Sequence, residues 1–493
     1  MTTATDTKPN QQQATRQEKD SLGVREVPAE AYYGIQALRG SENFPMTGIK
    51  PAQQYPELIW AFGCIKKAAA RTNMELQLLE PHQPELNQKI GQALMDAATE
   101  MIEGRFNQEF IVDVYQGGTG TSNHMNANEI LSNRANELLG GQKGVYSPVN
   151  PNDHANYGQS TNDVTPTVMR LTFLKKHGPL IESLCQLEAS FRRKADAFQT
   201  VLIAGRTHMQ DAVPLTMGQQ FAAYANALED ARAHLEFTVQ KLYRLGLGAS
   251  ALGTGLNTHP EYRRKVTGYL AEYTGFPLEM ARDYFQATSS FGLFSDYSSA
   301  LRSVAIELEK IAHDFKLYSS GPMTAIAELN LPQLQPGSSI MPGKVNPVLP
   351  ELMDQLSYAI QGNDLSVALC AQNGQWQLNV MMPLILIKIT ESQTLLTNGL
   401  KQFAEQCVDG VTVNETFIRQ RMEHSTILLT ALNPYIGYAH AAEIAKKVIA
   451  EGKTVREVAL SLGLTDKSGR PIDAARLDEI LSVEAMTAPR IAE

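Results

Sequence analysis

A glycine-flanked segment, residues 337–347, concentrates groups that could bind and act on an anion. Gly337 and Gly343 permit backbone conformations closed to other residues, so the segment can bring its N–H groups close to a negatively charged ligand. Lys344 adds a full positive charge next to two serine hydroxyls and one amide. Such a segment could be a lid that closes over a carboxylate, although its composition is also typical of an ordinary surface loop.

Two further glycine-rich polar segments lie between helical patterns, at residues 117–128 and 205–210. Segments of this kind often carry functional residues. The second contains Thr207 and His208, but a lone histidine is also typical of a purely structural contact. The run 160–163, Ser-Thr-Asn-Asp, is likewise typical of a helix N-cap when its residue types are considered alone.

The hydrophobic pattern predicts long helices and almost no strand. Apolar residues recur at steps of three and four from Met217 to Leu242 and from Leu301 to Phe315, and the segment 350–407 follows the same period with interruptions. Shorter helical patterns fill the C-terminal part. Long helices with heptad-type seams pack most easily as elongated bundles or across subunits. We therefore predict an all-α protein that forms oligomers.

Composition and charge exclude several classes of partner. The chain has 493 residues, 43% of them apolar, which is enough for a large core. A net charge of -9 and the absence of a long run of Lys and Arg argue against a nucleic-acid or acidic-membrane partner. No stretch approaches the roughly 18 apolar residues of a membrane helix. Residues 1–20 lack the apolar core of a signal peptide, and we predict a disordered tail on a cytoplasmic protein.

The residue patterns predict neither a metal nor an organic cofactor. The four cysteines lie far apart without a CxxC pair, and the ten histidines include no HExxH motif. The glycine-rich segment 117–121 lacks the Gly-Lys-Ser/Thr ending that a phosphate-binding loop requires.

Segment 337–347 resembles the signature loop of the fumarase/aspartase superfamily almost letter for letter. The resemblance covers roughly residues 20–485. Its other matching segments are 26–29, 116–129, 151–154, 159–167, 205–219 and 253–257. The resemblance implies three helical domains, which we place at residues 21–158, 159–415 and 416–493. It also implies that the central helices of four subunits form the core of a homotetramer, with each active site drawing on three subunits.

The resemblance further implies roles for individual residues. Ser338 would be the base that removes a carbon-bound proton beside a carboxylate, with Lys344 and loop N–H groups stabilising its alkoxide. Hydrogen-bond donors would hold the substrate: Thr121, Ser160, Thr161 and Ser339 at the carboxylate that accumulates charge, and Thr207, Lys344 and Asn346 at the other. Asn162 and His208 would face the leaving group, with Glu351 holding His208 in place.

Two dicarboxylate reactions fit this resemblance. Segments 116–122 and 374–381 favour deamination of L-aspartate to fumarate and ammonia, as does Thr161, where fumarases usually carry a second serine. Departures toward the fumarases, which interconvert fumarate and L-malate, occur at Thr119, Met382 and 430–447. We expect the ammonia-lyase reaction, with a class II fumarase as the alternative. A non-catalytic structural relative is the remote alternative, because the catalytic loop and its partner residues are all present.

Overall fold

The computed structural model describes residues 14–489. Contacts between residues divide the chain into two compact units, each built from three stretches of sequence. Unit 1 contains the residues up to Leu180 together with His234–Arg302 and Ala359–Leu395, and unit 2 contains Ile181–Ala233, Ser303–Tyr358 and the residues from Leu396 onward. Helices dominate both units, and the predicted all-α class is confirmed. Within the described residues, no helix is long and apolar enough to cross a membrane.

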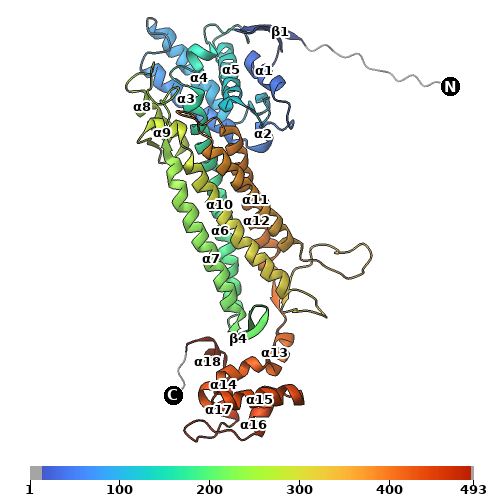
Figure 1. Ribbon diagram of the computed structural model, residues 1–493. Coiled ribbons are helices and arrows are strands. Elements are labelled where there is room, and N and C mark those ends of the chain that lie inside the picture. The colour runs from blue at the N-terminus through green and yellow to red at the C-terminus, as the bar shows by residue number, and fades with distance from the viewer. Residues whose placement is uncertain (1–13, 490–493) are drawn as a thin grey trace, which may run out of the picture. The chain divides into compact units, whose positions relative to one another are not determined.

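The N-terminal part of unit 1 is a β-hairpin followed by five helices (Figure 1). Their bounds are β1 Thr15–Asp20, β2 Gly23–Pro28, α1 Ile35–Asn43, α2 Pro51–Gln54, α3 Glu57–Glu75, α4 Pro84–Ile102 and α5 Thr121–Leu138. Helices α3 and α4 pack along each other, and α5 packs against α4 and α1. Ile90, Leu94 and Met101 recur at helical spacing on α4 and are buried. Gly91 allows the close approach, since a side chain there would meet Met74 of α3 at 2.6 Å.

The predicted disordered tail is wrong for residues 15–20, which form strand β1 and pair with β2 in an antiparallel register. The guanidinium of Arg16 donates hydrogen bonds of 2.8 to 3.0 Å to the carbonyls of Pro28, Ala29, Ala31 and Tyr33. These long-range bonds order a segment whose own residues are almost entirely polar. The remainder of the predicted tail, residues 1–13, lies outside the described residues.

Five long helices each contribute residues to both units. Their bounds are α6 Thr161–Ala197, α7 Met217–Val239, α10 Gly292–Tyr318, α11 Val348–Gln372 and α12 Met382–Gln406. The apolar periods predicted all but the first of these, and the interruption expected between 350 and 407 is the segment 373–381. In unit 1, Phe173, Phe294 and Tyr297 pack ring against ring. In unit 2, an equivalent cluster joins four helices through Phe191, Phe221, Tyr224, Phe315 and Phe403.

The remaining elements are short. Unit 1 adds β5 Arg244–Leu245, α8 Tyr262–Thr274, β6 Glu279–Met280 and α9 Tyr284–Ser289. Unit 2 adds β3 Leu202–Thr207, β4 Gln210–Thr216, β7 Leu329–Asn330, β8 Thr412–Val413, α13 Glu415–His424, α14 Leu429–Ile436, α15 Tyr438–Glu451, α16 Val455–Ser461, α17 Ala474–Ile480 and α18 Val483–Thr487. Single turns of 3-10 helix lie at 107–109, 118–120, 240–243, 408–410 and 426–428, and one of π-helix at 151–155.

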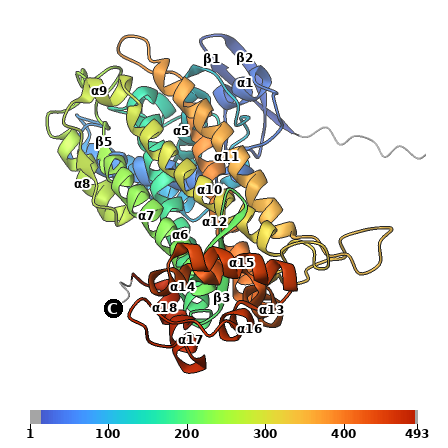
Figure 2. The ribbon, with the colours of Figure 1, turned by 60° about the horizontal axis from the view of Figure 1, so that its bottom comes forward.

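The last helices of unit 2, α13 to α18, gather into one group (Figure 2). The short helical patterns of the C-terminal part are thereby confirmed as α15 and α16. The three-domain division stays a prediction. Its boundaries at 158/159 and 415/416 lie next to the starts of α6 and α13.

A buried carboxylate caps the first helix. Glu129 of α5 accepts N–H hydrogen bonds from Gly34, Gln36 and Ala37 at 2.7 to 3.0 Å, although it is only 1% exposed. Burial raises the pKa of Glu129 to about 7, and the three N–H groups oppose that rise. The ionised form of Glu129 therefore lowers the stability of the fold, and the neutral form is favoured as the pH falls.

We predict that Glu129→Gln removes a pH-dependent part of the stability. A carboxyl group whose folded pKa is about 7, against an ordinary value of 4.5, stabilises the fold fully below pH 4.5 and loses that stabilisation as the pH rises through 7. The stability of the wild type relative to the variant should thus fall by up to about 3 kcal/mol between these limits. Urea midpoints measured from pH 4.5 to 7.5 test this.

The control is Glu26→Gln on the exposed face of the hairpin. Hydrogen bonds from Thr15 and Gln17 lower the pKa of Glu26, so its linkage acts only below pH 4.5. Its midpoint difference from the wild type should stay constant above that pH. A constant difference for Glu129→Gln as well would contradict the assignment.

Candidate active site

The loop after β7 is closed at its neck by backbone contacts. The N–H of Gly337 donates to the carbonyl of Lys344 at 2.7 Å, and the side-chain amide of Asn346 donates to the carbonyl of Gly337 at 2.9 Å. A side chain at position 337 would lie 2.8 Å from the backbone of both partners, so glycine is required there. Residues 338–343 therefore form a loop in unit 2 whose two ends are held together by the contacts of Gly337 with Lys344 and Asn346.

Within this loop the hydroxyl of Ser338 is surrounded by backbone donors. Its Oγ accepts hydrogen bonds from the N–H groups of Ile340 at 3.2 Å and Met341 at 3.0 Å. Two such donors favour the ionised form of the oxygen that they face. Within the described residues, the exposed ammonium of Lys344 forms no ion pair. The loop thus places a serine oxygen next to two N–H donors, with a cation six residues further along in sequence.

Thr207 and His208 lie at the tip of the β3–β4 hairpin rather than in an irregular loop as predicted. Thr207 ends β3 and pairs with Gln210, and His208 and Met209 form the turn with φ of 55° and 62°. Positive φ at both central residues is the geometry of a two-residue hairpin turn, and it is unfavourable for side chains such as those of histidine and methionine. All three side chains from 207 to 209 are exposed.

A buried ion pair anchors this hairpin. The guanidinium of Arg206 donates to both carboxylate oxygens of Glu328, at 2.5 and 3.1 Å. The side chain of Glu328 is 4% exposed and that of Arg206 is 19% exposed. The bidentate geometry fixes the end of β3 against the segment that leads into β7. It therefore sets the backbone position of Thr207.

Four predicted residues lie in unit 1, at the starts of two helices. Thr121 begins α5, and its hydroxyl donates to the carbonyl of Gly118 at 2.7 Å. Ser160 precedes α6 and caps it as its residue type indicates, since its Oγ accepts from the N–H of Asn162 at 3.2 Å. Thr161 begins α6, and the amide of Asn162 donates to the carbonyl of Ala251 at 2.7 Å.

The start of α6 is tied to the loop after β5 by a buried aspartate. The carboxylate of Asp163 accepts N–H hydrogen bonds from Ser160, Gly248 and Ser250 at 2.9 to 3.0 Å. Burial raises the pKa of Asp163 to about 6, while these donors and the ammonium of Lys66 oppose the rise. The three bonds hold residues 160–162 in a fixed arrangement.

Two residues missed by the sequence analysis adjoin this group. His124 of α5 places Nδ1 3.0 Å from Oγ1 of Thr161, and Nε2 of the same ring lies 2.8 Å from Nζ of Lys66 on α3. Both side chains are buried. Lys66 could have been found from the sequence, because it interrupts the apolar run of α3 and a buried lysine needs polar partners. The position of His124, one turn after Thr121, was the signal for the histidine.

The predicted residues fall into two groups. Unit 1 holds Thr121, Ser160, Thr161 and Asn162, whereas unit 2 holds Thr207, His208, Ser338, Ser339, Lys344, Asn346 and Glu351. Glu351 lies in the first turn of α11 and is exposed. Among the described residues no hydrogen bond or ion pair joins it to His208, so its positioning role stays a prediction.

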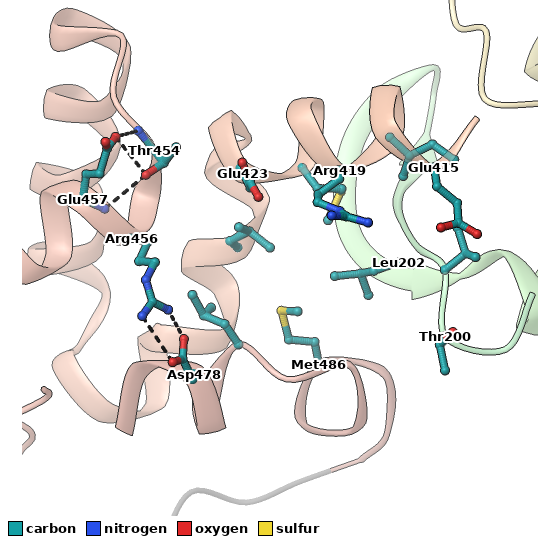
Figure 3. Close-up of a pocket in the computed structure, with 15 residues that line it drawn as sticks. Thr200, Leu202, Glu415, Arg419, Glu423, Thr454, Arg456, Glu457, Asp478 and Met486 are labelled. Atoms are coloured by element: carbon teal, nitrogen blue, oxygen red, sulfur yellow. Dashed lines mark hydrogen bonds and ion pairs between the residues drawn. The ribbon is translucent and has the colours of Figure 1, made fainter. Parts of the chain in front are cut away.

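Two cavities of unit 2 differ in their relation to the predicted site residues. One of about 690 Å³ lies beside α13, and none of the predicted site residues appears among the described residues that line it (Figure 3). Its charged groups are partly satisfied internally, since Arg456 pairs with Asp478. A smaller cavity, about 380 Å³, is lined by Arg206, Thr207 and Met209 of the hairpin.

Comparison with known proteins identifies the class. A family model described as "Lyase" matches residues 23–362, and one described as "Fumarase C C-terminus" matches residues 428–488. The helical fold and these matches define the chain as a lyase. The chain belongs to the fumarase/aspartase superfamily, and among its members it is a carbon–nitrogen lyase.

Several curated relatives match nearly the whole chain. An aspartate ammonia-lyase of Pseudomonas canavaninivorans is 46% identical over 97% of this chain and 98% of its own length. That of Escherichia coli strain K12 is 44% identical over 96% of each chain. A cobalt-bound fumarate lyase:delta crystallin of Brucella melitensis superposes with a TM-score of 0.90 at 43% identity, covering 97% of this chain and 100% of its own. A class II fumarase of Schistosoma mansoni gives 0.87 at 32% identity, covering 96% and 99%.

We predict that breaking the Arg206–Glu328 pair destabilises unit 2. Arg206→Met leaves an uncompensated buried carboxylate and should cost about 3 kcal/mol, the lower end for a buried pair because the guanidinium is partly exposed. The double variant Arg206→Met with Glu328→Gln should recover most of this loss, since no charge is left unpaired. Urea unfolding of both variants tests the pair. Equal destabilisation by the single and double variants would contradict it.

Proposed function

We propose that the protein is an aspartate ammonia-lyase, which converts L-aspartate to fumarate and ammonia reversibly. The observation that carries this proposal is the near full-length similarity, at 42 to 46% identity, to relatives that bear that name. The retained loop 337–347 supports the same chemistry. The proposed site has one serine base and two groups of hydrogen-bond donors. A saturated dicarboxylate with an amine on one carbon fits it, because each donor group would hold one carboxylate and the serine would remove a proton between them.

In this proposal Ser338 removes the proton from the substrate carbon that does not bear the amine. A serine hydroxyl is hardly ionised near neutral pH, so its alkoxide must be stabilised by the site. The N–H groups of Ile340 and Met341 already face its oxygen, which supports this role. Lys344 adds positive charge, and closure of the loop over the substrate excludes water, which strengthens both interactions.

The carbanion formed by proton removal spreads its charge into the adjacent carboxylate as an aci-form dianion. Donors that are already in place stabilise this state most, because their reorganisation cost is low. The proposed donors to this carboxylate are Thr121, Ser160, Thr161 and Ser339, of which Thr121 must turn its hydroxyl away from the carbonyl of Gly118 to donate to the substrate. Those proposed for the other carboxylate are Thr207, Lys344 and Asn346. Asp163 accepts N–H hydrogen bonds from Ser160 at the start of α6 and from Gly248 of the loop after β5, which supports such rigidity.

The leaving amine is proposed to face Asn162 and His208. The amide nitrogen of Asn162 is engaged with the carbonyl of Ala251, which leaves its oxygen as an acceptor. An acceptor suits a substrate ammonium, which has hydrogens to donate and no lone pair. His208, exposed at the tip of the hairpin, is the group proposed to meet the departing ammonia.

We further propose a homotetramer whose active sites are each shared by three subunits. Helix α11 supports an oligomer, because Tyr358, Leu365 and Leu369 recur at steps of seven and four and are 52 to 62% exposed. Such a stripe of apolar side chains on one helix is typical of an interface between helices. Static light scattering should report four chains per particle.

The second candidate is a class II fumarase, favoured by the "Fumarase C C-terminus" match at 428–488. We expect purified protein to raise fumarate absorbance and release ammonia with L-aspartate, and to show at most slow turnover of L-malate. Both substrates should be assayed at the same enzyme concentration. Activity with L-malate alone would reverse the assignment.

We predict that Ser338→Ala lowers kcat by about 10³ or more while the tetramer and its thermal stability are retained. Loss of a proton-transfer group whose charge is stabilised by its surroundings gives losses of this size. The matched control is Ser320→Ala, since Ser320 is, like Ser338, a half-buried serine in unit 2, but its hydroxyl donates to the carbonyl of Leu317. Unchanged turnover of Ser338→Ala would remove this residue from the mechanism.

A further inference from the structure

A chain of hydrogen bonds leads from the interior of unit 1 to Thr161. Nζ of Lys66 lies 2.8 Å from Nε2 of His124, and Nδ1 of that ring lies 3.0 Å from Oγ1 of Thr161. Lys66 is 3% exposed and His124 is 1% exposed, whereas Thr161 is only half-buried. His124 thus links the interior Lys66 to a hydroxyl that the proposed function assigns to a substrate carboxylate.

The surroundings of Lys66 indicate that it donates hydrogen bonds. Nε2 of Gln159 donates to the carbonyls of Ala155 and Tyr157, which leaves Oε1 to accept from Lys66 at 2.8 Å. The carbonyl of Ala155 is a further acceptor, 3.4 Å from Nζ. An ammonium has three hydrogens for these acceptors and the imidazole. Burial lowers the pKa of Lys66, and the carboxylate of Asp163 opposes that change.

The ring of His124 is held in one orientation and in one charge state. It stacks on Phe62, with 6.1 Å between ring centroids and 9° between planes. Burial and the adjacent Lys66 both lower the pKa of His124, so its ring is neutral near pH 7. A neutral imidazole carries one hydrogen, and the partner of one nitrogen decides which nitrogen holds it.

We propose that Lys66 and His124 are positioning residues that keep the hydroxyl of Thr161 as a donor toward the substrate carboxylate; this inference rests on the proposed function. Because Lys66 donates to Nε2, the hydrogen of His124 lies on Nδ1 and is donated to Oγ1 of Thr161. The threonine then has its own hydrogen free for the ligand. In the opposite tautomer Thr161 would donate to His124 and would present lone pairs to an anion.

The test measures binding of succinate, a dicarboxylate without a leaving group, to the intact oligomer by titration calorimetry. Lys66→Met, His124→Phe and Thr161→Val should each weaken binding about tenfold, the effect of one hydrogen bond to a charged acceptor. Combining Lys66→Met with Thr161→Val should weaken it no further than Thr161→Val alone, because the first substitution acts only through the threonine. His124→Phe keeps the ring that packs on Phe62 and tests the proposal even if Lys66→Met does not fold.

The matched control is His177→Phe. His177 is a half-buried histidine of unit 1, and its Nδ1 lies 3.0 Å from the hydroxyl of Tyr297. Its loss should lower thermal stability and leave succinate affinity unchanged. Wild-type affinity in both Lys66→Met and His124→Phe would overturn the proposal, as would an undiminished effect of Lys66→Met in the Thr161→Val background. A wild type that binds no succinate would instead overturn the proposed dicarboxylate function.

Discussion

The hydrogen bonds accepted by the buried carboxylate of Asp163 hold the start of α6 and the loop after β5 together in unit 1. The carboxylate accepts three N–H hydrogen bonds, one from the start of its own helix and two from the loop that follows β5. A carboxylate taken out of water costs several kcal/mol unless such donors and a counter-charge replace its hydration. The fold supplies both, because Lys66 is buried close enough to oppose the rise in the pKa of Asp163 that burial causes. The backbone geometry of residues 160–162 therefore depends on these buried polar groups.

Unit 2 positions its groups by a different physical means. The loop at 337–347 is closed by backbone hydrogen bonds at its neck, and the hairpin is anchored by the Arg206–Glu328 pair. Neither device buries the predicted reactive side chains, since Lys344 and His208 remain exposed. The proposed base Ser338 must become strongly basic only when substrate is bound. A loop that closes over the substrate and excludes water would provide that change. The proposed reaction requires rigid donors for the charged carboxylate and a loop that can close over the substrate. Unit 1 supplies such donors, and unit 2 supplies an exposed loop.

The sequence predicted the long helices other than α6, and the loop at 337–347, because helical periodicity and glycine spacing are local properties. It did not predict strand β1, whose polar residues are ordered by Arg16 reaching carbonyls 12 to 17 residues away. Lys66 and His124 were missed for a similar reason. Their roles depend on α3, α5 and α6 meeting in space, and no local pattern shows which buried polar side chains become partners. The same limit applies to Asp163, whose loop partners lie 85 and 87 residues further along the chain.

Backbone strain lies next to the proposed donors in both units. Thr119 has φ of 66° although its side chain is β-branched, and it directly precedes the turn into Thr121. His208 and Met209 carry the same left-handed strain directly after Thr207. Such conformations cost about 1 to 3 kcal/mol each, and they persist only where the surrounding structure fixes them. The flanking glycines at 118 and 120 share the positive φ, so glycine would relieve the strain at position 119 without changing the turn. Threonine at that position therefore costs stability directly beside Thr121, one of the proposed donors of unit 1.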